Sequence, residues 1–171
     1  MSAVFSRCGR YRYRLDRILG PGIKAAYIGV NPSRADATSN DPTIRKLIGF
    51  APGLGVGHWM VGNVFGFAAT DIAALRDCDD PVGPGNARHL RAMLIEADLV
   101  VIGWGTLGKL PAGLRDEHRR LLGMATRLRR DLHCWGVTGD QQPRHPLMLA
   151  YRTELERWSD AVQMVRPLGQ E

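Results

Sequence analysis

Four short apolar runs alternate with segments of helical periodicity along the chain, and this alternation predicts an α/β fold. The apolar runs predict buried strands at residues 25–30, 59–65, 99–103 and 133–137. Helices are predicted at residues 41–50, 87–97, 114–132 and 153–165. Strands separated by helices of this length form right-handed βαβ units. We therefore expect a three-layer α/β/α sandwich with a central four-stranded parallel sheet, in a single domain spanning residues 1–171.

Polar residues follow the carboxyl ends of these predicted strands. Parallel strands place their carboxyl ends along one edge of the sheet, where open α/β sheets bind their ligands. The first strand ends at Asn31, and Pro32 cannot continue the ladder of hydrogen bonds. We therefore expect a small-ligand site on this edge. The residues expected to form it are Asn31, Pro32, Ser33, Asp36, Asp41, Asn63, Phe65, Trp104, Thr138, Arg144 and His145.

Single residues in this set also have plain structural interpretations. Asparagine before proline is common in turns, so Asn31 alone does not define a site. Asn63 is more informative, because an amide inside an apolar run must find partners or cost ~1–3 kcal/mol. His145 also fits an ordinary loop, and Trp104 also fits a hydrophobic core. The hypothesis of a site depends on the shared edge.

The charge of the chain is compatible with a polyanionic partner, since its formal net charge is +6. Part of this charge has a simpler explanation. In the predicted helix at residues 114–132, the arginines lie opposite an apolar stripe, which is typical of a solvated helix face. These arginines are Arg119, Arg120, Arg127 and Arg130.

A second basic run, at residues 7–17, interleaves arginines with Tyr11 and Tyr13. This alternation indicates either a surface strand with one charged face or a contact that binds nucleic acid by charge and stacking. The sequence favours neither interpretation over the other.

Cysteine spacing and hydropathy argue against several classes of protein. Cys8, Cys78 and Cys134 are odd in number and include no CxxC pair, which argues against structural zinc, an iron–sulfur cluster and a disulfide framework. No apolar run reaches the ~20 residues needed to cross a bilayer. The first residues also lack the apolar segment of a signal peptide. We expect a cytoplasmic protein with reduced thiols, without cofactor, metal or membrane partner; the oligomeric state stays open.

Nearly the whole chain, from Tyr11 to Pro146, resembles a bacterial and phage domain family of unknown function. The motifs that carry this resemblance are NPSRADA at 31–37, DPTIR at 41–45, NVFGFAATD at 63–71, WG at 104–105 and QPRHPL at 142–147. This resemblance implies no activity.

More distantly, the order of the motifs resembles that of the uracil-DNA glycosylase superfamily. Its first strand ends in a G-x-N/D-P loop, which matches GVNP at residues 29–32. A base-reading asparagine at the end of its second strand matches Asn63, a third apolar strand ends near Trp104, and a late His-Pro loop matches His145. The resemblance implies a fold of that type and hydrolysis of an N-glycosidic bond. Asn31 would then orient a water, Asn63 would pair with an extruded base, and His145 would donate to a base oxygen.

The chain departs from that superfamily at both loops. The acidic residue that activates water in the most efficient uracil enzymes is absent from the first motif. Leu147, which follows the His-Pro pair, would serve as an apolar wedge or would simply pack. Asp36 and Asp41 would repel a phosphate backbone unless they pair with Arg34 or Arg45. We expect Arg34, Arg45 and Leu147 to contact nucleic acid.

Three functions remain open from the sequence. The first is recognition or hydrolytic release of a nucleobase from nucleic acid. The second is a non-catalytic module that binds a nucleobase or nucleotide in the same pocket. The third is an enzyme acting on a free nucleotide or nucleoside, with Asp36 and Asp41 holding a ribose or a metal. Binding to nucleic acid would weaken steeply with added salt, whereas binding of a neutral ligand would not.

Overall fold

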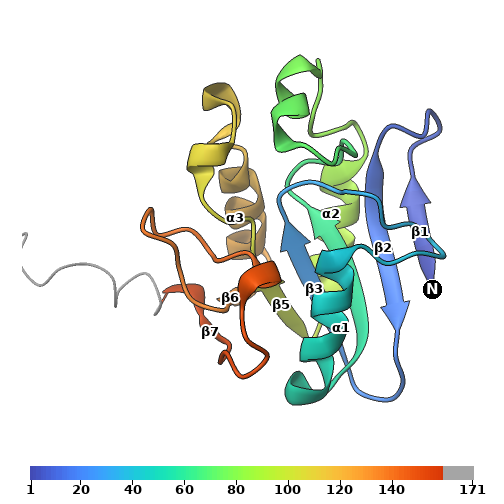
Figure 1. Ribbon diagram of the computed structural model, residues 1–171, viewed down its shortest axis with the longest axis vertical. Coiled ribbons are helices and arrows are strands. Elements are labelled where there is room, and N and C mark those ends of the chain that lie inside the picture. Colours follow the sequence, from blue (N-terminus) through green and yellow to red (C-terminus); the bar gives the residue numbers. More distant parts are fainter. Residues whose placement is uncertain (160–171) are drawn as a thin grey trace, which may run out of the picture.

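Seven strands form one mixed β-sheet in the computed structural model, which describes residues 1–159 (Figure 1). Along the sheet the strands follow the order β1-β2-β4-β3-β5-β6-β7. β3 pairs in parallel with β4 and β5, and β6 pairs in parallel with β5. The other three strands run antiparallel to their neighbours. The strands are β1 (Ser2–Phe5), β2 (Arg12–Ile18), β3 (Ile23–Gly29), β4 (Val56–Asn63), β5 (Leu99–Ile102), β6 (His133–Cys134) and β7 (Glu156–Arg157).

The α/β class predicted from the sequence is confirmed, but the sheet is mixed and has seven strands instead of the four predicted. The four predicted strands correspond to β3, β4, β5 and β6, which pair in parallel, and the three strands that were not predicted run antiparallel to their neighbours. β1 and β2 form an antiparallel hairpin that extends the sheet beyond β4, and β7 extends it beyond β6. The hairpin adds to the sheet because β2 pairs with β4 from Leu15↔Val61 to Ile18↔His58. Such a pairing joins residues far apart in the sequence, so no local pattern predicts it.

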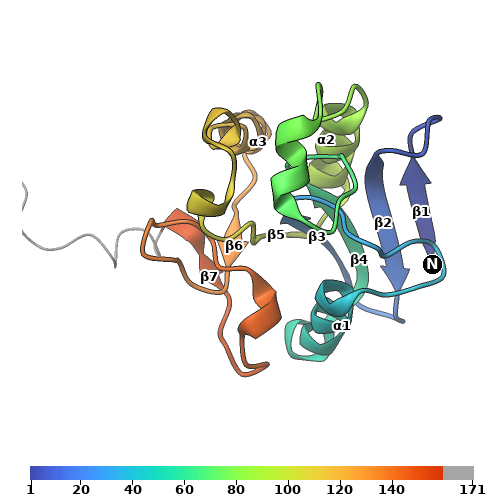
Figure 2. The same ribbon diagram turned by 45° about the horizontal axis from the view of Figure 1, so that its top comes forward.

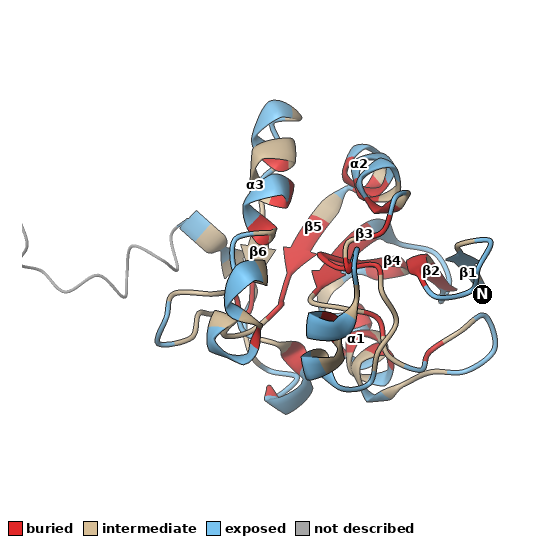
Figure 3. Cartoon of the chain, turned by 90° about the horizontal axis from the view of Figure 1, so that it is seen from above, coloured by how far each residue is buried: buried red, intermediate tan, exposed pale blue. Residues whose placement is uncertain are grey.

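Helices cover both faces of the sheet. α1 lies on one face, and α2 and α3 lie on the other (Figures 2 and 3). Within residues 1–159, no helix combines the length and the apolar character needed to span a membrane. The α-helices are α1 (Pro42–Leu54), α2 (Asn86–Glu96) and α3 (His118–Arg127), and the short 3-10 helices are η1 (Ile72–Asp77), η2 (Leu107–Lys109), η3 (Ala112–Leu114) and η4 (Pro146–Met148).

The first helix begins where the sequence predicts it. The Asp41 carboxylate accepts a hydrogen bond from the backbone N–H of Ile44 at 2.9 Å, and Pro42 occupies the first turn. The helix continues past the predicted end at Phe50 and stops before Gly55, whose φ of 65° closes the last turn. This start fixes Asp41 at the carboxyl edge of the sheet.

The other predicted helices agree in part with the structure. α2 is confirmed to within one residue. α3 is shorter than predicted at both ends, since residues 112–114 form η3 and the helix ends at Arg127. Its buried Leu121 and Ala125 and its exposed arginines confirm the solvated basic face for Arg119, Arg120 and Arg127. The prediction is wrong for Arg130, which lies beyond the helix and donates from Nη2 to the Ala97 carbonyl. In the described part of the predicted helix at 153–165, residues 156–157 form β7 and residues 158–159 are helical; residues 160–165 lie outside the described residues.

The basic run at residues 7–17 is not a surface strand. Most of β2 is buried, and Arg12 and Arg17 are only 3% and 1% exposed. Tyr11 and Tyr13 are buried as well, stacked on each other with ring centroids 6.1 Å apart. Neither ring is free to stack on a nucleic acid base, so the interpretation as a surface strand is wrong, and the geometry does not support stacking of a base on these tyrosines. The loop at residues 33–41 covers Arg12 and Arg17, whereas Tyr11 packs against Phe67 and Tyr13 against His89.

Hydrophobic cores fill both sides of the sheet. On the α1 side, Trp59 donates from Nε1 to the Leu47 carbonyl at 2.9 Å, and Phe50 stacks on Trp135 with centroids 4.4 Å apart. On the side of α2 and α3, the core contains Phe65 and Trp104. These two residues, both predicted to bind substrate, are therefore part of the packing between sheet and helices.

A close backbone crossing joins β2 to β3. Residues 19–22 pass over the first residues of β4, and Leu19 N–H bonds the Gly57 carbonyl at 2.8 Å. A Cβ on Gly57 would lie 2.7 Å from the Gly22 nitrogen, so no side chain fits there. The glycines at this crossing allow the chain to reach β3 on the far side of β4 with only a short loop.

We predict that Gly57→Ala destabilises the fold by about 1–3 kcal/mol, because the added methyl meets backbone atoms that cannot rotate away. Gly53→Ala is the matched control, since a Cβ there meets nothing within 4 Å and alanine favours the helix by up to about 1 kcal/mol. Urea denaturation of both variants measures the difference. Equal unfolding midpoints for the two variants would contradict the crossing as a constraint.

Candidate functional site

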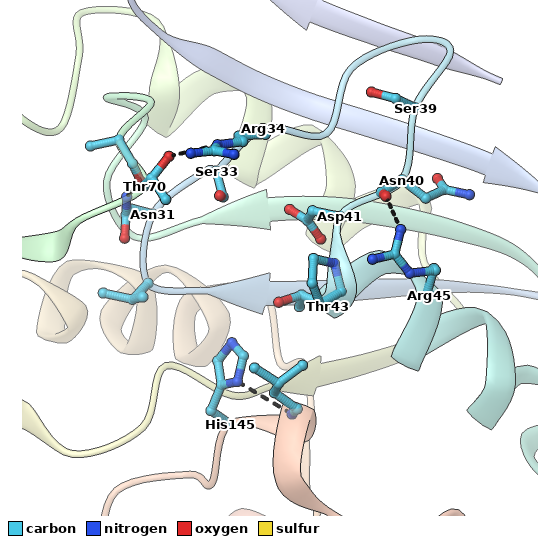
Figure 4. A pocket seen from close by; sticks show the side chains of 14 residues that line it. Asn31, Ser33, Arg34, Ser39, Asn40, Asp41, Thr43, Arg45, Thr70 and His145 are labelled. Carbon is cyan, nitrogen blue, oxygen red and sulfur yellow. Dashed lines mark hydrogen bonds between the residues drawn. The ribbon is translucent and has the colours of Figure 1, made fainter.

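A pocket of about 600 Å³ opens at the carboxyl edge of β3, beside the first turn of α1 (Figure 4). Four segments contribute to it: the loop after β3, the start of α1, the segment after β4, and the loop before η4. Its lining residues are Val30, Asn31, Ser33, Arg34, Ser39, Asn40, Asp41, Pro42, Thr43, Arg45, Ala69, Thr70, His145 and Leu147.

About half of the site residues predicted from the sequence line this pocket. The structure brings them together from positions more than 100 residues apart, because the loops after β3 and before η4 meet at one edge of the sheet. The predicted residues found in the lining are Asn31, Ser33, Arg34, Asp41, Arg45, His145 and Leu147.

The side chain of Asn31 is held in one orientation by its amide hydrogens. Nδ2 donates to the Ala69 carbonyl at 2.7 Å and to the Pro32 carbonyl at 3.2 Å. Because both donors are directed at the chain, Oδ1 remains as a hydrogen-bond acceptor, and Figure 4 shows it on the side of the cavity. Asn31 therefore presents a fixed carbonyl oxygen to a ligand or a water.

His145 presents a donor on the opposite side of the pocket. Its Nδ1 accepts a hydrogen bond from the Leu147 N–H at 3.3 Å, so in the neutral ring the proton is on Nε2. Burial lowers the pKa of His145 below its ordinary value; Asp41 acts in the opposite direction and Lys109 lowers the pKa further. The ring is neutral at pH 7 and offers an N–H to the pocket.

Asp41 is the one carboxylate among the lining residues that the structure describes. Its Oδ1 caps helix α1, while the carboxylate as a whole faces the cavity between Ser33 and Thr43 (Figure 4). Asp41 and His145 both line this pocket. The pocket thus combines an amide acceptor, a carboxylate and an imidazole donor.

Asp36 was also predicted to bind substrate, but its carboxylate closes the loop instead. Oδ1 accepts hydrogen bonds from the backbone N–H and the hydroxyl of both Thr38 and Ser39, at 2.8–3.0 Å. These bonds hold the pKa of Asp36 well below its usual range. Asp36 does not line the pocket, so the sequence-based idea that Asp36 and Asp41 act together finds no support in the geometry.

Two buried arginines of β2 hold this loop in place, and sequence reasoning missed both. Arg17 donates from Nη2 to the carbonyls of Asp36 and Ser39, at 2.6 and 2.8 Å, and from Nε to Asn40 Oδ1 at 2.6 Å. Arg12 donates from Nη1 to the Ala35 carbonyl at 2.7 Å. One signal in the sequence could have indicated this role. The arginines alternate with apolar side chains in a strand that is long enough to lie inside the sheet.

Asn63 and Trp104 lie outside the lining. Asn63 is 4% exposed, its Oδ1 lies over Gly29, and its Nδ2 has no hydrogen-bond partner among the described residues. Trp104 donates from Nε1 to Gln142 Oε1 at 3.0 Å and packs against His118. The prediction of a site at the edge of the sheet could not distinguish side chains at the strand ends that line the pocket from those that are buried in the protein.

Pro32, Thr138 and Arg144 lie outside the lining as well. The Pro32 carbonyl accepts from Asn31 and from the Ala69 N–H, so it secures the loop after β3. The Thr138 hydroxyl donates to Asp140 and to the Gln142 carbonyl. Arg144 is exposed, and its backbone N–H donates to the Gly136 carbonyl.

The structure adds four polar lining residues that the sequence analysis did not single out: Ser39, Asn40, Thr43 and Thr70. Two of them fix the arginines at the mouth, since Arg34 Nε donates to the Thr70 hydroxyl and Arg45 Nη1 donates to the Asn40 carbonyl. Within residues 1–159, no group of three or more His, Cys, Asp or Glu side chains is arranged to hold a metal ion.

A family model described as a protein of unknown function (DUF1643) matches residues 12–147, which is most of the chain. The chain belongs to this family. The predicted resemblance to a domain family of unknown function is confirmed over these residues. Neither a curated protein nor a solved structure matches the chain.

The DUF1643 segment contains the complete candidate site. It begins at Arg12 and ends at Leu147, so it includes both buried arginines and every residue that lines the pocket. The hairpin strand β1 and the terminal strand β7 lie outside it.

We predict that Arg17→Met costs at least about 2 kcal/mol, because it leaves the carbonyls of Asp36 and Ser39 without their buried donor. The same change should release the loop, so trypsin should cleave after the exposed Arg34 faster than in the unmodified protein. Peptide mass analysis of a trypsin time course measures this. Arg119→Met, on the solvated face of α3, serves as the control; equal cleavage of both variants after Arg34 would contradict the assignment.

Proposed function

We propose that the protein recognises a nucleobase in nucleic acid and releases it by hydrolysis of the N-glycosidic bond. One observation carries this proposal: the Asn31 carbonyl oxygen, the Asp41 carboxylate and the His145 Nε2–H surround a single pocket. These three groups are what the reaction requires.

The chemistry passes through an oxocarbenium-like sugar and needs a positioned water more than a strong nucleophile. Asn31 Oδ1 and Asp41 hold this water, and Asp41 accepts its proton as the water attacks C1′. His145 donates a hydrogen bond from Nε2 to an oxygen of the departing base, on which negative charge develops. Asp41 thereby supplies, from the start of α1, the acidic group that the first motif lacks.

Residues at the mouth would receive the rest of the nucleic acid. Arg34 and Arg45 are exposed there and would contact phosphates. Leu147 is 41% exposed beside the pocket and would take the place of the extruded base. Asn63 lies outside the lining, so base recognition in this proposal rests on His145.

A fold related to the uracil-DNA glycosylase superfamily is part of the same proposal. Support comes from the order of the motifs, since the G-x-N-P loop follows β3, Asn63 ends β4 and the His-Pro pair opens η4. The mixed sheet and helices on both faces are compatible with this relation.

The decisive experiment incubates the protein with single-stranded and duplex oligonucleotides that carry uracil, hypoxanthine or alkylated bases. Alkaline cleavage then reports abasic sites. We expect Asn31→Ala, Asp41→Asn and His145→Ala each to lower the rate of release by about 10²-fold or more. Asp41→Asn is the sharpest variant, because asparagine still caps a helix while it removes the charge.

Arg88→Ala is the matched control, since Arg88 is exposed on α2 and does not line this pocket. Base release that survives all three pocket substitutions would place the reaction elsewhere. Binding of base-containing ligands without release would instead favour the non-catalytic module. Release from free nucleotides alone would favour the third function.

We also predict the pH dependence of release. Because burial lowers the pKa of His145, the ring stays neutral as the pH falls through the ordinary imidazole value of about 6.5. The rate should therefore hold to below this value and then fall, because protonation of Nδ1 breaks the bond from the Leu147 N–H. The stability contributed by the neutral ring should be lost over the same range. A rate profile in which the acid limb lies above pH 7 would contradict this assignment.

A further inference from the structure

Two cations are buried beneath the loop that lines the pocket, and among the described residues neither is in direct contact with a carboxylate. Arg12 and Arg17 are 3% and 1% exposed. Neither makes an ion pair with a carboxylate in residues 1–159. Buried charges are normally paired, because leaving water costs several kcal/mol per ion. Asp36, Asp41 and Asp16 act on Arg17 through space, and Asp41 acts on Arg12, but no carboxylate of the described residues forms a direct ion pair with either arginine.

The hydrogen bonds of these arginines go mainly to the backbone of the loop. Arg12 bonds the Ala35 carbonyl, and its Nε has no partner in the described chain. Burial lowers the pKa of Arg12 to about 10, an effect that Asp41 opposes and Arg17 reinforces. At neutral pH both guanidinium groups remain charged and poorly solvated.

The peptide groups of the loop are oriented by the buried arginines. In a trans peptide the carbonyl and the following N–H point to opposite sides. Since the Ser39 carbonyl is turned to Arg17, the Asn40 N–H faces away from it. Ser39 and Asn40 both line the pocket, so the positive ends of these peptide dipoles lie on the ligand side of the buried arginines.

The remaining charges of the site add to this effect. Arg34 and Arg45 are exposed at the mouth. Asp36 directs its carboxylate into its own loop, where four hydrogen bonds stabilise it. Asp41 is the one carboxylate of the described lining, which also contains Arg34 and Arg45. Arg12 and Arg17 lie outside the lining and bond the carbonyls of the loop that contributes to it.

We propose that the pocket is an anion site that binds a phosphate group of the ligand against Ser39 and Asn40, with the buried Arg12 and Arg17 and the exposed Arg34 and Arg45 supplying the countercharge. The site thus selects phosphorylated nucleotide units over unphosphorylated nucleosides. The identity of the group that carries the phosphate rests on the proposed function, but the anion preference does not.

Inorganic phosphate is the direct probe. At constant ionic strength, phosphate should raise the melting temperature of the protein above its value in chloride. Uridine 5′-monophosphate should bind at least about tenfold more tightly than uridine, since a charge-assisted hydrogen bond is worth that ratio or more. Equal melting temperatures in phosphate and chloride would overturn the anion site. Base release without a preference for phosphate would leave the proposed function intact and overturn the anion site. A preference for phosphate without base release would leave the anion site intact and contradict the proposed function.

Variants of Arg12 test the countercharge. Arg12→Lys keeps the charge and should retain the response to phosphate, whereas Arg12→Met should lose it; Arg88→Met is the control that should change nothing. If the lysine and methionine variants respond alike, Arg12 acts only as a structural residue and the proposal fails. Should Arg12→Met not fold, the double variant Arg34→Met/Arg45→Met replaces it, and unchanged phosphate binding there would count equally against the anion site.

Discussion

The candidate site depends on the hydrogen bonds that the buried Arg17 guanidinium donates to the loop after β3. This loop is broken by proline and contains no regular structure, so it has few contacts of its own to fix its path. Arg17 bonds it at three points, Asp36, Ser39 and Asn40, and the next residue begins α1. The position of the helix, the opening of the pocket and the direction of the loop carbonyls all follow from this contact.

Local signals in the sequence were sufficient to predict part of this arrangement. The Asp-Pro pair predicted the start of α1, since a side-chain cap and a proline act within one turn. The end of the strand at Asn31 was equally local. The antiparallel pairing of β2 with β4 was not predictable in this way, because it joins residues 40 to 46 positions apart and the arginines of β2 resemble those of an exposed strand.

The difference between local signals and long-range packing also explains which residues of the candidate site could be predicted from the sequence. Asn31, Asp41 and His145 could be predicted to meet, because each follows or begins an element whose end lies at one edge. Which face a strand-end side chain occupies depends on the register, so Phe65 could not be distinguished from a ligand contact and is instead part of the core. Arg12 and Arg17 escaped notice for a related reason: their role is visible only when the loop lies over them.

The double use of Asp41 separates what the fold requires from what the chemistry requires. As a helix cap, this position needs only a short side chain with an oxygen, and asparagine or serine would serve α1 about as well. The charge itself contributes little to starting the helix. On the proposed mechanism, a relative with an uncharged cap at this position would therefore fold normally and bind the same ligands while lacking a base. The charge at this one position would then separate a hydrolase from a receptor built on the same architecture.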